Sequence, residues 1–412
     1  MKLSKIGAPL AILTASALVL TGCGAANEPA AAPAPANTAG GASTAGGSAL
    51  SGTLTGKGAS SMNAAQTTWI AEFQTANPGV TVNYSPDGSG AGRDAFKAGA
   101  ADFAGSDRAF KDEEMGAGNF ATCADTSNAL NLPVFISPIA VIYKVEGVTD
   151  LQLDAATIAG IFSGKITKWN DPAITALNEG KTLPDANITA VHRSDNSGTT
   201  ENFTDYLAQV APEVWTEDAS GDWPTAYVGE AAKGTSGVVD AVKSGTNTIG
   251  YADAGQAPDL DHVQVKVGDQ HFGPEAEAAA KLVDNASKVE GRGEHDWALK
   301  LDRKAEDQYP IALVAYAMVC EEYKDAAQGA LVKEYLSYVT SNEGQQAASV
   351  TRPEKQTGSQ EDGQYLGSIP HHAVSCLLQY IGGQGHPERR QFHVKGAAAA
   401  PLQNGCQFAP HQ

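Results

Sequence analysis

Residues 54–73 read LTGKGASSMNAAQTTWIAEF and show in one stretch how the chain is built. A short strand-like run leads into a turn rich in Gly and Ser, Gly56-Lys57-Gly58-Ala59-Ser60-Ser61. The apolar side chains that follow recur at helical spacing, at Met62, Ala65, Trp69 and Phe73. The stretch therefore predicts a strand, a tight turn and an amphipathic helix, in that order.

The same order recurs twice further along the chain. Gly88-Ser89-Gly90-Ala91-Gly92 precedes a helical segment at Ala95 and Phe96, and Arg193-Ser194-Asp195-Asn196-Ser197-Gly198-Thr199 precedes another at Phe203. More strand-like runs lie at residues 80–84, 134–143 and 188–191. Because strands and helices alternate from Leu54 to about Ser349, the sequence predicts an α/β fold.

Each of these turns could bind an anion. The first N–H groups of a helix have no carbonyl partner, and the helix dipole adds partial positive charge there. Glycine allows close approach to the backbone, and Ser or Thr hydroxyls donate without adding charge. A single such turn is usually an ordinary N-cap, but three in one chain, one of them with Arg193, favour an anion site.

The charge balance excludes some partners. Asp and Glu outnumber Lys and Arg by 47 to 28, which gives a formal charge of −19. A nucleic acid or an anionic membrane surface would require basic patches, so we expect neither. An anionic ligand must therefore be held by local donors.

Sequence signals for catalysis and metal binding are weak. No GxxxxGK[ST] loop and no GxSxG elbow is present. Ser197 and His192 could form part of a hydrolase site, but residues five apart across a strand-to-helix turn need not meet. With no CxxC pair and no His/Cys cluster, we expect no metal, no cofactor and no enzyme activity.

The N-terminus carries an export signal. Lys2 and Lys5 precede an apolar run over residues 6–20, which is followed by Leu20-Thr21-Gly22-Cys23. This tetrad resembles the bacterial lipobox, so residues 1–23 are expected to be a lipoprotein signal peptide, with Cys23 acylated; the alternative is an ordinary secretory signal. Residues 24–50 are rich in Ala, Gly, Pro, Ser and Thr and predict a flexible linker with a reach of about 30 Å.

The remaining cysteines and the C-terminus allow fewer conclusions. Export permits disulfides, and Cys123, Cys320, Cys376 and Cys406 allow three pairings. We favour Cys123 with Cys320, because both flank apolar strand-like segments. Residues 350–412 lack the preceding periodicity and are treated as an atypical tail, either loosely folded or the product of a frameshift.

Four stretches together resemble the phosphate-binding protein of the bacterial Pst ABC transporter. They are Leu54-Thr55-Gly56-Lys57-Gly58-Ala59-Ser60, Asp102-Phe103-Ala104-Gly105-Ser106-Asp107, Ile161-Phe162-Ser163-Gly164-Lys165-Ile166-Thr167-Lys168-Trp169-Asn170 and Arg193-Ser194-Asp195-Asn196-Ser197-Gly198-Thr199-Thr200. The resemblance covers about residues 52–349 and implies a periplasmic-binding-protein fold of class II.

The resemblance also implies a set of ligand-binding residues. In that family the anion is held by loops that correspond here to Ser60 and Ser61, Ser89, Asp107, Arg193, Ser197, Gly198 and Thr199. Asp195 would hold Arg193 in place. Without the resemblance, Asp107 would be assigned as a helix cap or as a partner of Arg108. Most family members have Thr-Phe where this chain has Ser60-Ser61, and the closing Gly-Tyr-Ala-Pro-like segment is missing after Ala348.

The implied architecture has two α/β lobes with the anion between them. Lobe one would comprise residues 51–140 and 309–349, lobe two residues 141–308, with crossovers near 140 and 308. The implied function is phosphate import by a lipid-anchored monomer on the outer face of the cell membrane, with the permease subunits of the ABC transporter as partners. A binding protein for sulfate or another oxyanion, and an exported phosphatase, are the alternatives.

Overall fold

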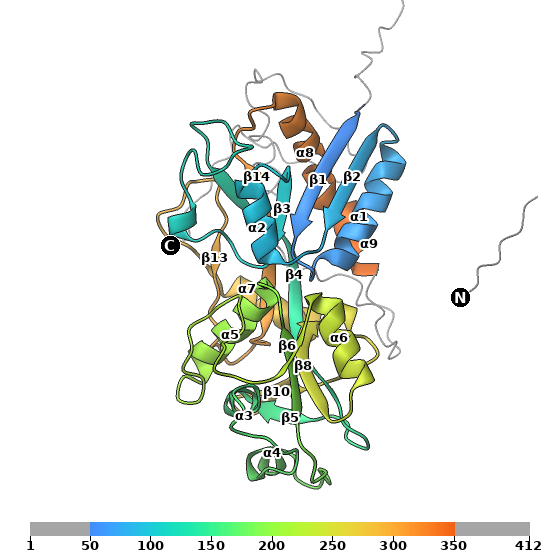
Figure 1. The fold of residues 1–412 in the computed structure, drawn as a ribbon, viewed down its shortest axis with the longest axis vertical. Coiled ribbons are helices and arrows are strands. Elements are labelled where there is room, and N and C mark those ends of the chain that lie inside the picture. The colour runs from blue at the N-terminus through green and yellow to red at the C-terminus, as the bar shows by residue number, and fades with distance from the viewer. Residues whose placement is uncertain (1–49, 351–412) are drawn as a thin grey trace, which may run out of the picture. The chain divides into compact units, whose positions relative to one another are not determined.

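The computed structural model describes residues 50–350, which belong to one compact unit. The predicted signal peptide with Cys23, most of the predicted linker, and the predicted tail with Cys376 and Cys406 lie outside the described residues. Within residues 50–350 the fold is α/β, as predicted, with helices against the faces of a long twisted sheet (Figure 1).

One sheet runs through both halves of the described chain. Its strand order is β2-β1-β3-β14-β4-β8-β6-β7, and β9 also pairs with β4. The upper half in Figure 1 contains β1 (Gly52–Gly58), β2 (Val80–Ser85), β3 (Phe103–Ser106) and β14 (Ala312–Cys320). The lower half contains β6 (Thr189–Arg193), β7 (Glu230–Ala232), β8 (Thr248–Asp253) and β9 (Asp261–His262). We refer to these halves as lobe one and lobe two.

Strand β4 (Ala129–Lys144) belongs to both lobes. Residues 129–138 pair with β14, and residues 139–144 pair with β8. Every residue from Ala129 to Tyr143 is buried, as expected for a strand covered on both faces. Two prolines mark its irregular points, because proline cannot donate to a ladder. Pro133 adjoins a register shift, and Pro138 is the last residue before the strand changes partner.

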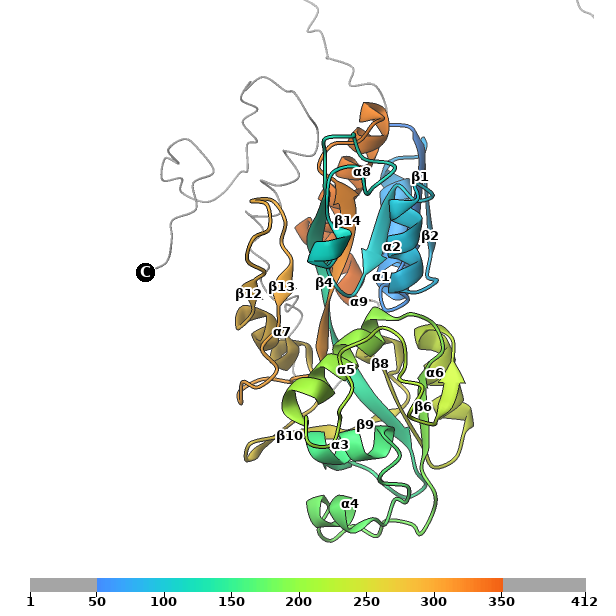
Figure 2. The same cartoon turned by 60° about the vertical axis from the view of Figure 1, so that its left-hand side comes forward.

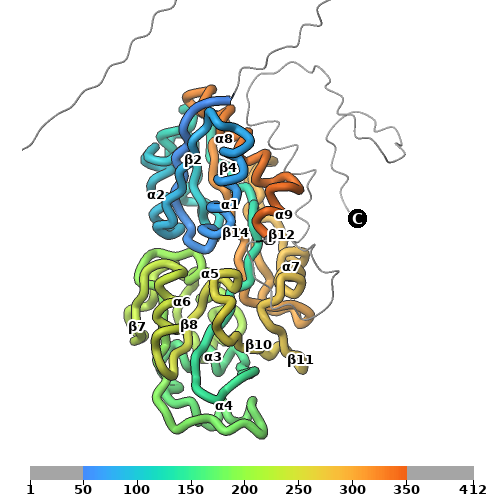
Figure 3. The backbone as a smooth tube through the Cα atoms, turned by 90° about the vertical axis from the view of Figure 1, so that its right-hand side faces the viewer, coloured from blue at the N-terminus to red at the C-terminus, as the bar shows by residue number. Residues whose placement is uncertain are grey.

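Helices cover each lobe. In lobe one they are α1 (Asn63–Ala76), α2 (Ser89–Lys97), α8 (Ala326–Val339) and α9 (Asn342–Val350), with a 3-10 turn at Asp112–Glu114. Helices α1 and α9, from opposite ends of the described chain, lie side by side (Figure 3). The buried side chains of α1 include Trp69 and Phe73, which belong to the predicted helical stripe, and those of α8 include Leu331, Tyr335 and Val339.

Lobe two has a similar cover. Its helices are α3 (Ala155–Phe162), α4 (Pro172–Leu177), α5 (Gly198–Val210) and α6 (Gly234–Ser244), with a 3-10 turn at Ala254–Gln256. A small second sheet has the order β11 (Gln270–Phe272), β10 (Gln264–Val267), β5 (Gln152–Asp154). Among residues 50–350, no helix combines the length and apolar character that a membrane span requires.

One segment differs from the predicted lobe boundaries. Helix α7 (Ala276–Asp284) and the hairpin of β12 (Ser287–Lys288) and β13 (Leu299–Lys300) fall within the range assigned to lobe two. In the structure they lie beside β4 and β14 (Figure 2). The Asn131 amide donates to Asp296 at 3.0 Å, and Arg292 pairs with Asp112 at 2.8 Å, so polar contacts from lobe one fix this segment. Polar contacts of this kind produce no periodic pattern of apolar residues, so no sign of them was visible in the sequence.

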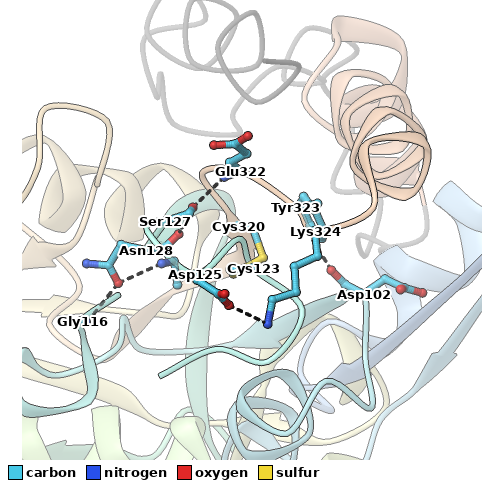
Figure 4. The surroundings of a disulfide bond; sticks show 11 residues. Asp102, Gly116, Cys123, Asp125, Ser127, Asn128, Cys320, Glu322, Tyr323 and Lys324 are labelled. Carbon is cyan, nitrogen blue, oxygen red and sulfur yellow. Dashed lines mark hydrogen bonds and ion pairs between the residues drawn. A yellow bond between two sulfur atoms is a disulfide. The ribbon is translucent and has the colours of Figure 1, made fainter. Parts of the chain in front are cut away.

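A disulfide joins Cys123 to Cys320, as predicted (Figure 4). It links the loop that precedes β4 to the end of β14, across a separation of 197 residues. Neighbouring contacts support the same junction: Lys324 pairs with Asp125 at 3.0 Å, and the Tyr323 hydroxyl donates to the Asp102 carbonyl at 2.7 Å. The bridge therefore fixes β14 to the N-terminal part of lobe one.

Candidate functional site

The three predicted turns each follow a strand and begin a helix. They lead from β1 to α1, from β2 to α2 and from β6 to α5. The first two belong to lobe one and the third to lobe two, and they meet between the lobes. A Cβ atom added to Gly198 would lie 2.6 Å from Asp107 Cβ and 2.7 Å from Ser89 Oγ. Glycine is therefore required at the start of α5, because no larger residue fits against lobe one.

Three other predicted residues contact Asp107. The Ser61 hydroxyl donates to Oδ1 at 2.6 Å, and the Thr199 hydroxyl donates to Oδ2 at 3.1 Å. The Asp107 backbone N–H donates to Ser89 Oγ at 3.2 Å. Asp107 is only 3% exposed. Four of the predicted residues, from four separate segments of the chain, thus come together: Ser61, Ser89, Asp107 and Thr199.

Burial dominates the electrostatics of this carboxylate. Desolvation raises the pKa of Asp107 to about 6, although hydrogen bonds from Ser61 and Thr199 and the charge of Arg193 act in the opposite direction. The group is therefore mostly ionised at pH 7, in surroundings that favour its neutral form. A ligand that donates a proton to it would relieve this cost.

Arg193 is held by Asp195, as predicted. Nε donates to Oδ1 at 2.8 Å and Nη2 to Oδ2 at 2.5 Å, and Arg193 is only 2% exposed. Burial alone would raise the pKa of Asp195, but the hydrogen bonds and charge of Arg193 and the N–H of Gly234 lower it. A guanidinium has about five N–H groups, and Asp195 accepts from two of them. The remaining N–H groups of Arg193 can donate to further partners.

Ser197 and Ser60 have different positions from the Asp107 cluster. Ser197 is the N-cap of α5, and its Oγ accepts from the Thr200 N–H at 3.2 Å. Ser60 Oγ accepts from the N–H of Thr235 across the lobes at 3.1 Å. Gln256 of lobe two also donates to the carbonyls of Ser60 and Ser61, at 3.1 and 2.8 Å. The first loop is therefore held by lobe two through its backbone as well as its side chain.

The start of α6 belongs to the same region and was missed by the sequence reasoning. Gly234, with φ +72°, donates its N–H to Asp195 Oδ1 at 3.0 Å, and Thr235 contacts Ser60. The signal was present, because Lys233-Gly234-Thr235-Ser236-Gly237 is a fourth Gly- and Ser-containing turn before a helix. It follows β7, which has only three residues and no β-branched side chain.

His192 does not form the hydrolase pair considered above. Its Nδ1 lies 2.9 Å from its neighbour's carbonyl oxygen at Arg193, and its ring stacks on Trp223 at 4.7 Å between centroids. Desolvation lowers the pKa of His192. Ser197 Oγ is engaged in its helix cap instead. Among residues 50–350, no cluster of His, Cys, Asp and Glu suits a metal ion.

Comparison with known proteins identifies the family. The family model for the PBP superfamily domain matches residues 43–343. The phosphate-binding protein PstS 3 of Mycobacterium tuberculosis is 36% identical over 344 residues, which cover 82% of this chain and 90% of that protein. This chain belongs to the PstS family. The predicted family is confirmed.

Solved structures support the fold of this PstS-family chain. A periplasmic phosphate-binding protein, PfluDING, matches with a TM-score of 0.59 and 21% identity over 73% of this chain and 89% of that one. A phosphate ABC transporter substrate-binding protein from Clostridium perfringens matches with a TM-score of 0.53 and 20% identity, over 73% and 98%. The predicted periplasmic-binding-protein fold is confirmed. The PstS family is one of solute-binding proteins.

Proposed function

We propose that this protein captures inorganic phosphate between its two lobes, outside the cytoplasm, and delivers it to an ABC transporter for import. The observation that carries the proposal is the Asp107 carboxylate, buried among neutral donors beside Arg193. The name and the 36% identity of the mycobacterial PstS 3 protein support the same ligand.

The site offers phosphate both kinds of hydrogen bond. Phosphate keeps at least one proton near neutral pH, so it can donate to Asp107. Its other oxygens can accept from the hydroxyls of Ser60, Ser89 and Ser197, from the N–H of Gly198, and from Arg193. The hydroxyls of Ser61 and Thr199 each have a single proton, so they would turn from Asp107 to the ligand in order to donate to it. Charge-assisted hydrogen bonds of this kind are stronger in a closed cleft, where the dielectric constant is low. Closure of the lobes would then hold the anion, and reopening would release it.

A calorimetric titration with phosphate, sulfate and arsenate tests this function. We expect tight binding of phosphate and weak binding of sulfate, because a fully ionised anion would meet the Asp107 carboxylate with no proton to share. Tight binding of sulfate would favour the alternative of another oxyanion. Hydrolysis of a phosphate monoester by the purified protein would favour the exported phosphatase.

The anchoring of the protein is part of the same proposal. Cys23 would carry a lipid that holds a monomer at the outer face of the membrane, near the permease. We expect Cys23→Ser to release the protein from the membrane fraction and to remove the mass of the lipid. Retention of the variant in the membrane at unchanged mass would contradict the lipobox. Phosphate affinity should be unaffected, because every proposed ligand residue lies between 60 and 199.

We do not expect the predicted tail to contribute to the site. We expect a chain that ends at residue 350 to bind phosphate as the full chain does and to melt cooperatively. It retains α9, whose Gly344 carbonyl accepts from the indole of buried Trp69 at 2.6 Å. The measurement is calorimetric binding together with thermal unfolding of both chains. Loss of the cooperative transition would show that residues 351–412 are part of lobe one.

A further inference from the structure

Two contacts next to the anion site join the lobes without using the proposed ligand groups. Arg108, which follows β3 in lobe one, donates from Nε to Glu201 Oε2 on α5 at 2.9 Å. The Asn202 amide, on the same helix, donates to the backbone carbonyl of Asp107 at 2.7 Å. Glu201 and Asn202 are called the α5 latch below. The carboxylate of Asp107 takes no part in either contact.

Arg108, the lobe-one partner of the latch residue Glu201, is also held by contacts within lobe one. Arg108 Nη1 donates to Glu114 Oε2 at 2.6 Å and to the Ala109 carbonyl at 2.7 Å. Glu114 also accepts from Lys97 at 2.8 Å. Burial would raise the pKa of Glu114, but these cations and the N–H of Lys111 lower it to about 2. Glu114 therefore stays ionised and keeps Arg108 in place.

The lobe-two side is fixed as well. Asn202 Nδ2 donates to the Gly198 carbonyl at 2.9 Å, and Oδ1 accepts from Arg303 Nη2 at 2.6 Å. Arg303, 1% exposed, also donates to the carbonyls of Pro310 and Ala312 at 2.9 and 3.1 Å. These two residues lie where the chain passes into β14. The amide is thus oriented by the segment that joins the lobes.

We propose that the α5 latch holds the lobes closed and sets the rate at which the bound anion leaves, without selecting which anion binds. The inference rests on the proposed function. Because Arg108 and Asn202 are each held by contacts within their own lobe, closure forms the contacts at little further cost in their side-chain entropy. The side chains of Arg108 and Glu201 are 17% and 13% exposed, so solvent screens their attraction only in part. The latch opens whenever the lobes separate.

The test is stopped-flow release of phosphate from the full-length protein. We expect Glu201→Gln and Arg108→Gln each to release phosphate about tenfold faster, the size of one lost charge-assisted hydrogen bond. The double variant should release it no faster than the faster single variant, because each single substitution already removes the bond between Arg108 and Glu201. The ratio of phosphate to sulfate affinity should stay at the wild-type value. Wild-type release rates, or additive effects in the double variant, would overturn the proposal.

Asp185→Asn is the matched control. It removes one carboxylate from an ion pair with Lys168, 2.6 Å long, which lies wholly in lobe two. The net charge changes as in Glu201→Gln, but no contact between the lobes is lost. We expect wild-type release. If Asp185→Asn released phosphate as fast as Glu201→Gln, general charge rather than the latch would account for the effect.

A second readout needs no ligand. The N–H of Gly90 donates to the Asn196 carbonyl across the lobes at 3.3 Å, and that of Thr235 donates to Ser60 Oγ. We expect both amides to exchange with deuterium faster in Glu201→Gln than in wild type and Asp185→Asn. Equal exchange in all three proteins would overturn the latch. If wild type bound no phosphate, the proposed function would fail, and amide exchange would still decide the latch.

Discussion

Replacing Asp107 with Asn should abolish most of the preference for phosphate over sulfate. The wild-type carboxylate only accepts hydrogen bonds, so it repels an anion that has no proton. Asn keeps the shape and can donate. Since an unmatched buried charge costs several kcal/mol, we expect the selectivity ratio to fall by about 3 kcal/mol, roughly a hundredfold. Both affinities would be measured by calorimetry for both proteins at one pH and salt concentration.

The raised pKa of Asp107 predicts how Asp107→Asn changes stability, which serves as a control that the variant is folded. The pKa of Asp107 in the fold, about 6, lies above its model-peptide value of 3.8. Its ionisation therefore costs stability as pH rises through 6, and this cost is absent below about pH 4. Ligand-free Asp107→Asn should consequently melt at or above the wild-type temperature at pH 7.5. An unchanged selectivity ratio in a folded variant would contradict the role of Asp107 in the choice of anion.

Replacing Arg193 with Ala should weaken phosphate binding by about 2–5 kcal/mol, the usual cost of removing one partner of a buried charge pair. Arg193 is the one cation among the proposed ligand residues, its charge acts on Asp107, and Asp195 fixes its guanidinium. Lysine should restore only part of the affinity, because it lacks the planar fork. Calorimetric titration of the three proteins provides the measurement.

The loss in Arg193→Ala has two sources that a second substitution separates. Without Arg193 the Asp195 carboxylate keeps the Gly234 N–H but has no cation, and it would repel the anion. We expect Asp195→Asn in the Arg193→Ala background to recover part of the affinity and leave the rest lost. Wild-type affinity in Arg193→Ala alone would remove Arg193 from the site.

The sequence predicted the features that depend on residues close together in the chain. The strand, turn and helix order at residues 54–73 and the apolar stripe on α1 follow from spacing along the chain, and both appear in the structure. The gathering of Ser61, Ser89, Thr199 and Asp107 needed the family resemblance, because these residues lie on four segments. Their role as phosphate ligands stays a prediction.

The missed features depend on contacts between distant residues. Asn202 and Arg303 are 101 positions apart, and neither lies in a recognisable motif. The placement of residues 276–300 beside lobe one depends on the apolar packing of Ala279 and Leu282 with Ala312 and on polar contacts such as that of Asn131 with Asp296. A polar residue gives little sequence evidence of its partner, whereas an apolar stripe at least shows which helix face is buried.

The position of β14 dictates an order of assembly. Lobe two takes its strands of the long sheet from residues 139–262, so that part of its sheet can pair while the chain is still being completed. The sheet of lobe one cannot be completed as early, because β14 lies between β3 and β4 and ends only at Cys320. Pairings this distant in sequence are slow to form. Lobe one is therefore the last part of the molecule to fold completely. Its first three strands have an unpaired edge until β14, in the last quarter of the chain, pairs between β3 and β4.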